Sequence, residues 1–377
     1  MSALHDTARR FGEEVIAPNA EAWNTAGSVP RSYFAQAGTA GLCGLLVPTA
    51  LGGAGASMRS FGEVLEILSR HCLASTFALV VHNNLANAIA RHGNDEQRER
   101  YLTAMLAGNS VGAFLLTEPM AGSDAAAIKT RAVRGEHGWT LTGSKAWVSN
   151  AQNADLLAVY ADAERGAQSG MASFLVDAGM PGVEVGAPYA LFGGHALGAA
   201  AVSLDQCTVA PGAMMAAPGE GLRAALRGID LARIAVGAMC CGVMASALGE
   251  ALTYTNERRA FGQRLRNFQG LEWKLADCAT DLEAARALTY RAADQLDQGE
   301  DASLVAAHAK KFAADVAFRR VADCMQALGA NGLMRSRPLA RHLEAAKTAQ
   351  YVDGTSEIQN VVISRRLDAA YGNPQSA

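Results

Sequence analysis

The stretch Gln350-Tyr351-Val352-Asp353-Gly354-Thr355-Ser356-Glu357-Ile358-Gln359 combines residue types that could do chemistry. Asp353 directly precedes a Gly-Thr pair, after which an apolar helix is expected to begin. Glycine lets the backbone approach a ligand closely, and threonine is a common residue at a helix N-terminus. A carboxylate at this point can lie in the wall of a cavity while the N–H groups of the turn point inward. The alternative interpretation is that Asp353-Gly354 is only a turn.

Length and composition narrow the class of protein. The chain has 377 residues, 50% of them hydrophobic, and a formal net charge of −3. This length can bury a large core and suggests two or three packed domains. The near-neutral charge argues against nucleic acid and against anionic membranes as partners. The N-terminus has no secretory apolar segment, and we expect no uninterrupted apolar run that approaches membrane-spanning length.

The cysteines favour a protein of a reducing compartment. They number seven, and they lie scattered at positions 43, 72, 207, 240, 241, 278 and 324. An odd number without metal-ligand spacing predicts buried, reduced thiols rather than a disulfide framework or a zinc site. We therefore expect a cytoplasmic protein without a metal site.

Residues 1–110 are predicted to form an α-helical domain. The spacing of apolar residues predicts a helix that ends near Pro18, and further helices at 30–41, around 61–68, at 74–92 and from Asn94 onward. Asn94 offers an acceptor side chain suited to a helix N-terminus. We interpret His82 as a hydrogen-bonded helix residue rather than a catalyst.

Residues 111–218 are predicted to form a β domain, a small barrel or a sandwich. Short segments rich in β-branched and aromatic residues alternate here with glycine, asparagine and aspartate. The expected strands are 111–116, 128–134, 139–142, 156–161, 173–176, 182–185 and 200–204. The loop 135–138 has the residues of a hairpin turn.

Residues 219–377 are predicted to form an α-helical bundle. The expected helices are 222–259, 268–298, 302–329, 338–350 and 355–370. Helices near thirty residues long are typical of a four-helix bundle, and apolar residues on several of their faces suggest contacts with other subunits. The predicted fold class is therefore α+β, with a helical domain, a β domain and a helical bundle in that order.

Four stretches stand out along the chain. They are Leu116-Thr117-Glu118-Pro119-Met120-Ala121-Gly122-Ser123-Asp124, then Gly143-Ser144-Lys145-Ala146-Trp147-Val148-Ser149-Asn150, then Glu257-Arg258-Arg259-Ala260-Phe261-Gly262-Gln263 with Phe268-Gln269, and finally Asp353-Gly354-Thr355. In this order they resemble the motifs of the acyl-CoA dehydrogenase family over nearly the whole chain, and the first three are similar to its patterns LTEPxAGSD, GxKxWI(T/S)N and RxxFG…Q. The resemblance implies FAD as the cofactor.

The reaction implied by this resemblance can be argued from chemistry. Oxidation of an acyl thioester between its α and β carbons needs a base for the α proton and a hydride acceptor, and side chains cannot accept hydride. A carboxylate in a dry pocket has the raised proton affinity that such a base requires. The resemblance assigns this role to Asp353, and a backbone N–H beside it would bind the thioester oxygen. The flavin N5 would take the hydride.

The resemblance also implies roles for other residues. Thr117 and Ser149 would hydrogen-bond the isoalloxazine ring, Trp147 would pack against it, and Ser123 would lie near the flavin and the pantetheine arm. Arg258, Phe261 and Gln269 would reach the pyrophosphate and adenine of an FAD held mainly by a neighbouring subunit. Further positions that match the cofactor site are Gln326, Gly329, Thr355 and Glu357, and those that match the substrate site are Asp230, Arg233 and Gly354.

Several of these residues have a simpler interpretation. Thr117 and Ser149 could be ordinary hydroxyls at strand ends, and Trp147 a core aromatic. Arg258 could form a surface ion pair with Glu257 or Glu250. Asp230 and Arg233 could be charges at the start of a helix.

The chain departs from the family pattern in two ways that concern the base. Most members carry glutamate where this chain has Asp353, which is one methylene shorter. The alternative glutamate position, on the long helix, is occupied here by Ala232. An aspartate resembles the subset that acts on alicyclic thioesters such as cyclohexanecarboxyl-CoA. It also resembles the nitroalkane oxidases, although these place an arginine where this chain has Asn360. Ala260 replaces a common hydroxyl in the third motif.

We therefore expect an FAD-dependent acyl-CoA dehydrogenase, a homotetramer that passes electrons to an electron-transferring flavoprotein. A cyclic or branched acyl group is favoured over a straight chain. Three alternatives stay open: a carrier-protein thioester as substrate, a flavin oxidase or monooxygenase similar to nitroalkane oxidase, and an acyl-CoA-binding or assembly protein without turnover.

Overall fold

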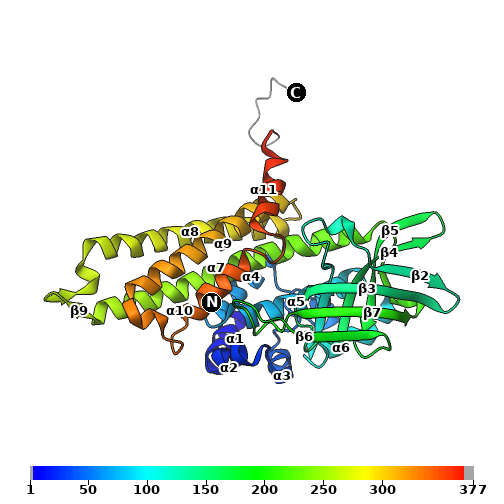
Figure 1. The fold of residues 1–377 in the computed structure, drawn as a ribbon, viewed down its shortest axis with the longest axis horizontal. Coiled ribbons are helices and arrows are strands. Elements are labelled where there is room, and N and C mark those ends of the chain that lie inside the picture. The colour runs from blue at the N-terminus through cyan, green and yellow to red at the C-terminus, as the bar shows by residue number, and fades with distance from the viewer. Residues whose placement is uncertain (1–2, 369–377) are drawn as a thin grey trace.

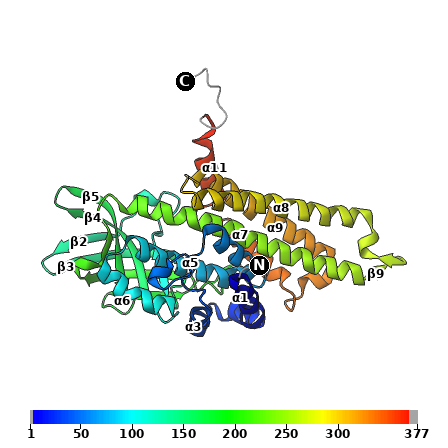
Figure 2. The same ribbon diagram turned by 180° about the vertical axis from the view of Figure 1, so that it is seen from behind.

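The structure is a computed structural model that describes residues 3–368. Its elements follow one another as a helical group, a sheet and a second helical group (Figure 1). The predicted α+β class and the order of its three parts are confirmed. The long helices of the C-terminal group run away from the sheet, and the N-terminal helices lie against both (Figures 1 and 2).

The N-terminal group contains the helices α1 Ala3–Phe11, α2 Ala20–Ala26, α3 Arg31–Thr39, α4 Met58–Ser69, α5 Leu73–His92 and α6 Asp95–Leu106. A π-helical segment, Gly12–Ile16, continues α1, and α2 was not predicted from the sequence. Asn94 begins α6 with a capping box, because its side chain accepts from the Gln97 N–H while the Gln97 side chain accepts from the Asn94 N–H. The predicted role of Asn94 is confirmed.

His82 on α5 connects this group with the sheet. Its Nε2 lies 3.0 Å from the Met105 carbonyl oxygen, and the Gly112 N–H donates to its Nδ1 at 3.2 Å. Burial lowers the pKa of His82 to about 4, so the ring is neutral near pH 7. The prediction that His82 is a hydrogen-bonded helix residue is confirmed.

The β domain is one continuous sheet rather than two packed sheets. Its strands are β1 Gly112–Leu115, β2 Arg131–Gly135, β3 Gly138–Val148, β4 Leu156–Arg165, β5 Gln168–Asp177, β6 Val183–Pro188, β7 Ala200–Val209 and β8 Met214–Ala216. Their order is β6-β7-β3-β2-β4-β5-β8, with β1 parallel to β4. The short β8 was not predicted. Alternate residues of these strands form an apolar core of their own.

The C-terminal group contains α7 Gly221–Glu257, α8 Gln269–Asp297, α9 Ser303–Ala327, α10 Leu339–Ala349 and α11 Ser356–Ser364. A two-stranded hairpin, β9 Arg259–Ala260 and β10 Gln263–Arg264, joins α7 to α8. The sequence predicted a longer last helix, 355–370, but α11 ends at Ser364, and residues 369 and 370 lie outside the described residues.

The helices of the bundle pack closely where small residues meet. A Cβ atom at Gly242 on α7 would lie 2.2 Å from both the Glu66 carbonyl oxygen and the Ser69 hydroxyl oxygen on α4. Only glycine fits there, so α7 and α4 touch backbone to backbone. The same core contains six of the seven cysteines, and all seven are buried and unpaired, as predicted.

One sequence expectation about α7 was wrong. By length and composition this helix would suffice to cross a membrane, contrary to the expectation of no such apolar run. However, 78% of its most apolar window is buried inside the protein. The core helix of a globular protein has the same properties, so α7 is weak evidence for a membrane span.

Candidate active site

The loop between α10 and α11 holds Asp353 in an uncommon backbone conformation. Asp353 has a φ of 53° and Gly354 a φ of 91°, so two consecutive residues are left-handed. Few residues other than glycine adopt this region, although aspartate and asparagine do so several-fold more often than most. Thr355 then caps α11, because its hydroxyl oxygen accepts from the Ile358 N–H at 3.4 Å. The predicted cap is confirmed.

Two buried cations hold the carbonyl groups of this loop. Lys310 Nζ on α9 donates to the carbonyl oxygens of Gln350 at 2.9 Å and Gly354 at 2.8 Å. Arg233 Nε on α7 donates to the carbonyl oxygen of Asp353 at 3.3 Å. The loop is therefore fixed through its backbone, and these hydrogen bonds leave the Asp353 side chain unused.

Asp230 accompanies Arg233 on α7. Arg233 Nη1 donates to Asp230 Oδ1 at 2.8 Å, and the Arg233 side chain is nearly buried. Burial raises the pKa of Asp230, and the charge of Arg233 opposes that rise. The structure thus brings together four of the residues predicted for the base and the substrate, Asp230, Arg233, Asp353 and Gly354, while the fifth, Ser123, lies in the loop after β1.

The Asp353 carboxylate has no hydrogen-bond or ion-pair partner within residues 3–368. Its Oδ2 is buried without a hydrogen bond, and no cation of residues 3–368 lies within 4.0 Å of the carboxylate. Burial raises the pKa of Asp353 to about 6, while the charges of Lys310 and Arg233 oppose the rise. The N–H groups of Asp353 and Gly354 also donate to no group in that part of the chain. A free carboxylate and two free donors therefore meet in one loop.

Three residues of the first two motifs gather where β1 and β3 end. The Thr117 carbonyl accepts from the Ala146 N–H at 2.9 Å. Trp147 has a φ of 58° and is 59% exposed, and its ring lies against Tyr189 with 4.6 Å between centroids. The hydroxyls of Thr117 and Ser149 have no partner among the described residues. An exposed indole beside free hydroxyls fits a flat aromatic ring with polar edges.

Packing connects this group with the Asp353 loop. Leu116, next to Thr117, shares an apolar cluster with Ile229 on α7, and Ile229 precedes Asp230. On another path, Thr348 Oγ1 on α10 donates to the Gly193 carbonyl at 3.3 Å, in the loop that follows Tyr189. The two groups of residues therefore lie on neighbouring elements.

Five of the predicted cofactor residues lie elsewhere. The hairpin and the adjoining helix ends carry Arg258, Phe261, Gln269, Gln326 and Gly329, at the end of the bundle far from the sheet (Figure 1). α7 has 37 residues, which corresponds to a length of about 55 Å. Phe261 is 95% exposed. One chain alone does not bring these residues to Trp147.

Three of the remaining candidates are exposed. Arg258 is exposed and forms neither of the predicted ion pairs, since Glu250 instead accepts from Arg337 at 2.8 Å. Glu357 is exposed at the start of α11, where hydrogen bonds from its own N–H and from the Thr355 hydroxyl hold its pKa below the usual value. Ser123 is exposed in the loop after β1.

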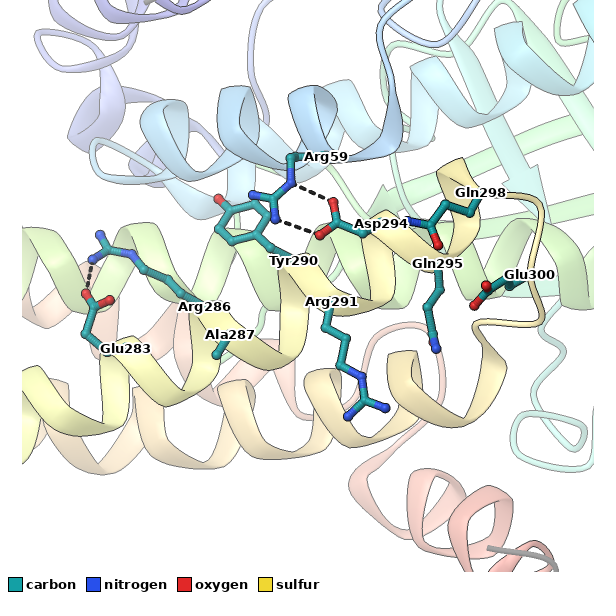
Figure 3. A pocket seen from close by; sticks show the side chains of 10 residues that line it. All are labelled: Arg59, Glu283, Arg286, Ala287, Tyr290, Arg291, Asp294, Gln295, Gln298 and Glu300. Atoms are coloured by element: carbon teal, nitrogen blue, oxygen red, sulfur yellow. Dashed lines mark hydrogen bonds and ion pairs between the residues drawn. The ribbon is translucent and has the colours of Figure 1, made fainter.

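A surface hollow elsewhere on the protein does not contain the predicted residues. It has a volume of about 630 Å³ and lies between α4 and α8 (Figure 3). Two of the three arginines that line it already have partners, since Arg59 pairs with Asp294 at 2.6 Å and Arg286 with Glu283. Tyr290 also lines it and donates to Glu66 at 2.6 Å. We therefore place the candidate site at Asp353 instead.

Three buried charged residues were not recognised from the sequence as part of the site. Lys145 and Glu118 lie within the quoted motifs and form a buried ion pair. Lys310 contacts the Asp353 loop. A signal for Lys310 was present, because it shares the helical stripe of Ala306, Ala313 and Ala317, whereas Lys311 does not.

A buried carboxylate with free oxygen, near an exposed aromatic surface, is an arrangement that suits an oxidoreductase with a bound ring cofactor. Comparisons with known proteins agree. Family models described as the N-terminal, middle and C-terminal domains of acyl-CoA dehydrogenase match residues 1–109, 113–207 and 219–368. The chain is 34% identical over 361 residues to an acyl-CoA dehydrogenase of Bacillus subtilis (strain 168), which covers 95% of both chains.

Solved structures give the same result. Butyryl-CoA dehydrogenase from Megasphaera elsdenii matches with a TM-score of 0.92 and 31% identity, covering 97% of this chain and 98% of that one. A glutaryl-CoA dehydrogenase from Mycobacterium smegmatis in complex with FADH2 matches with a TM-score of 0.91 and 26% identity, covering 98% and 94%. The chain belongs to the acyl-CoA dehydrogenase family. It is an oxidoreductase and a flavoprotein.

Proposed function

We propose that this protein removes hydrogen from the α and β carbons of an acyl-CoA thioester, with Asp353 as the base for the α proton. FAD is the cofactor, and when bound it supplies the acceptor for the β hydride. The free, buried Oδ2 of Asp353 is the observation that carries the proposal. A carboxylate whose pKa is raised to about 6 is largely ionised near pH 7 and still basic enough to take a proton.

The backbone of the same loop supports activation of the thioester. The free N–H groups of Asp353 and Gly354 are suitable donors for the thioester oxygen, on which negative charge develops as the proton leaves. Asp230 and Arg233 line the same place from α7. We assign them to orientation of the thioester and the pantetheine arm, together with Ser123.

The residues at β1 and β3 support the cofactor assignment. We propose that the isoalloxazine ring lies on Trp147 and receives hydrogen bonds from Thr117 and Ser149. The far hairpin residues Arg258 and Phe261, with Gln269, Gln326 and Gly329, would then serve the FAD of a neighbouring chain. Their distance from Trp147 along one chain favours this arrangement, and the family resemblance makes a homotetramer the proposed assembly. Thr355 and Glu357 would line the cofactor from the start of α11.

For the acyl group we propose a cyclic or branched chain, because the short arm of Asp353 resembles that subset. A short straight chain is the competitor, and butyryl-CoA dehydrogenase is among the similar structures. An electron-transferring flavoprotein as acceptor and a cytoplasmic location stay predictions.

An anaerobic titration of the FAD-loaded protein tests the function. The panel contains cyclohexanecarboxyl-CoA, isobutyryl-CoA and butyryl- to palmitoyl-CoA, and the visible absorbance of the flavin is followed. Bleaching by one thioester in the wild type, lost in Asp353→Asn, would support the proposal and define the acyl class. Bound flavin without bleaching would point to a carrier-bound thioester or a nitroalkane, and oxygen consumption with peroxide formation would indicate an oxidase. A colourless tetramer after FAD addition would indicate a binding or assembly protein.

A further inference from the structure

Lys310 is a fully buried lysine that no catalytic step assigned above uses. A buried ammonium group is costly unless its N–H groups are satisfied. Here Nζ donates at 2.9 Å and 2.8 Å to the carbonyl oxygens of Gln350 and Gly354, which lie on either side of Asp353. Lys310 thus bridges the two ends of the segment that contains the proposed base.

The segment needs such a bridge. Asp353 and Gly354 both have positive φ values, 53° and 91°, and a non-glycine residue stays in that region only where its surroundings hold it there. The end of α10 and the residue after the base are joined by one side chain from α9. Release of this bridge would let the loop relax toward ordinary backbone angles and move the carboxylate.

A second residue of α9 also contacts this loop. Asp315 Oδ1 accepts from Gln350 Nε2 at 3.3 Å and from Ser356 Oγ at 3.3 Å. α9 therefore contacts the loop with one cation and one anion. The cation has a further effect, because its positive charge acts on the Asp353 carboxylate.

We propose that Lys310 is the positioning residue of the base: it fixes the left-handed Asp353 loop through two carbonyl groups, and its charge favours the ionised carboxylate. The role in catalysis rests on the function proposed above. The effect on the carboxylate does not. The titratable and charged groups around this place are Arg233, Asp230 and Cys240 on α7, Lys310 and Asp315 on α9, Lys347 on α10 and Glu357 on α11.

The charges act in the expected directions. The positive charges of Lys310 and Arg233 lower the pKa of Asp353 against the larger effect of burial. Burial lowers the pKa of Lys310 to about 8, and the charge of Asp353 opposes that change. Near pH 7 both groups are therefore charged, without a direct contact within 4.0 Å. Lys310 acts on the base through the backbone and through space.

The test measures the ionisation of Asp353 without substrate. The FAD-loaded protein is labelled with ¹³C in its aspartate carboxyl groups, and Asp353→Asn identifies the signal to be followed against pH. The variants are Lys310→Met, which removes charge and donors, Lys310→Gln, which keeps a donor, and Lys310→Arg, which keeps the charge. Lys311→Met is the matched control, because it removes the same charge from the next residue of α9.

We expect the midpoint of the Asp353 carboxyl titration to rise by about 1–3 pH units in Lys310→Met and Lys310→Gln, because a nearby opposite charge is lost. Lys310→Arg and Lys311→Met should leave it unchanged. The acid limb of flavin reduction should move by the same amount. If Lys310→Met fails to fold, Lys310→Gln decides the question.

An unchanged midpoint in the uncharged Lys310 variants would overturn the proposal and leave Lys310 as a purely structural lysine. If no thioester reduces the flavin in any of the proteins, the proposed function fails instead, and the midpoints still decide whether Lys310 controls Asp353.

Discussion

Lys145 and Glu118 form an ion pair of 2.8 Å whose side chains are 0% and 7% exposed. Glu118 also accepts from the N–H groups of Lys129 at 2.6 Å and Thr130 at 2.9 Å, and Lys145 Nζ donates to the Leu116 carbonyl at 3.1 Å. Burial raises the pKa of Glu118, but these hydrogen bonds outweigh it and hold the pKa below its usual value. The pair joins the motif that contains Thr117 to the motif that contains Trp147.

Removal of Lys145 should therefore disturb both motifs at once. We expect Lys145→Met to lower the free energy of unfolding by about 3–5 kcal/mol, because Glu118 would remain as a buried charge without its partner. FAD retention should fall with it. Urea unfolding and the flavin content after gel filtration measure the two effects. Lys274→Met, which removes a half-exposed cation 4.0 Å from Asp323, is the control and should cost about 0–1 kcal/mol. Equal stability of Lys145→Met and wild type would refute the prediction.

The raised pKa of Asp353 predicts a particular dependence of stability on pH. Between its ordinary value of 3.8 and about 6, the folded state binds more protons at Asp353 than the unfolded state does. Stability from this group is therefore fully present below the ordinary value and falls as the pH rises toward 6. Across this window wild type should lose about 3 kcal/mol relative to Asp353→Asn. Denaturant unfolding of both proteins from pH 4 to 7.5 measures this, and a constant difference would contradict it.

The short side chain of Asp353 predicts an effect of Asp353→Glu on substrate choice. The longer arm moves the carboxylate by about one carbon–carbon bond, and a misplacement of about 1 Å can cost about 10²-fold in rate. We expect the preferred thioester of the wild type to reduce the flavin about 10²-fold more slowly in this variant. Straight-chain thioesters should be affected less. Stopped-flow reduction across the panel checks it, with Asp353→Asn as the inactive reference. An equal change in rate for all thioesters would contradict the prediction that side-chain length at position 353 determines substrate choice.

The exposed ring of Trp147 predicts a contribution to FAD binding. Loss of an aromatic stacking contact of about 1.5 kcal/mol corresponds to a weakening of roughly tenfold. We expect at least this loss of FAD affinity in Trp147→Ala, and near-normal affinity in Trp147→Phe. Titration of the FAD-free protein, followed by flavin fluorescence, gives the affinities. Val133→Ala, which removes another exposed apolar side chain of the sheet, is the control. Trp147→Ala with wild-type affinity would exclude the proposed stacking.

The position of the far hairpin predicts that variants complement one another. If each FAD site combines Trp147 of one chain with Arg258 and Phe261 of another, then Trp147→Ala and Phe261→Ser each damage every site of their own oligomer. Refolding the two variants together should restore a fraction of intact sites. FAD content of mixed and separate samples measures this restoration. Samples that gain nothing on mixing, while each forms the same oligomer, would show that the hairpin does not serve a neighbouring site.

Much of the fold could be predicted because long periodic segments dominate it. The predicted limits of α7, α8 and α9 lie within a few residues of the observed ones, since each carries an apolar stripe of many turns and ends at a breaking residue. The short elements α2, β8 and the β9–β10 hairpin were missed. They contain too few residues to show a period, and their partners in the fold decide their conformation.

The site was predictable only as far as residue types reveal roles. The motifs led to Asp353, Thr117 and Trp147, but the burial of Lys145 and Lys310 depends on side chains contributed by other elements. The sequence of α9 does not indicate that Lys310 donates a hydrogen bond to Gln350, which lies 40 residues further along the chain. The free Oδ2 and the free N–H groups likewise follow from tertiary geometry.

The left-handed φ of Asp353 has a consequence for which residues this position can accept during evolution. Aspartate enters this backbone region several-fold more often than most non-glycine residues, while branched residues are strongly disfavoured there. Aspartate at this position therefore adopts the left-handed backbone at a lower cost in free energy, whereas glutamate has the longer side chain. A protein with aspartate at this position has a less strained loop. Its thioester substrate must then bind closer to the loop, because the carboxylate does not extend as far toward the substrate.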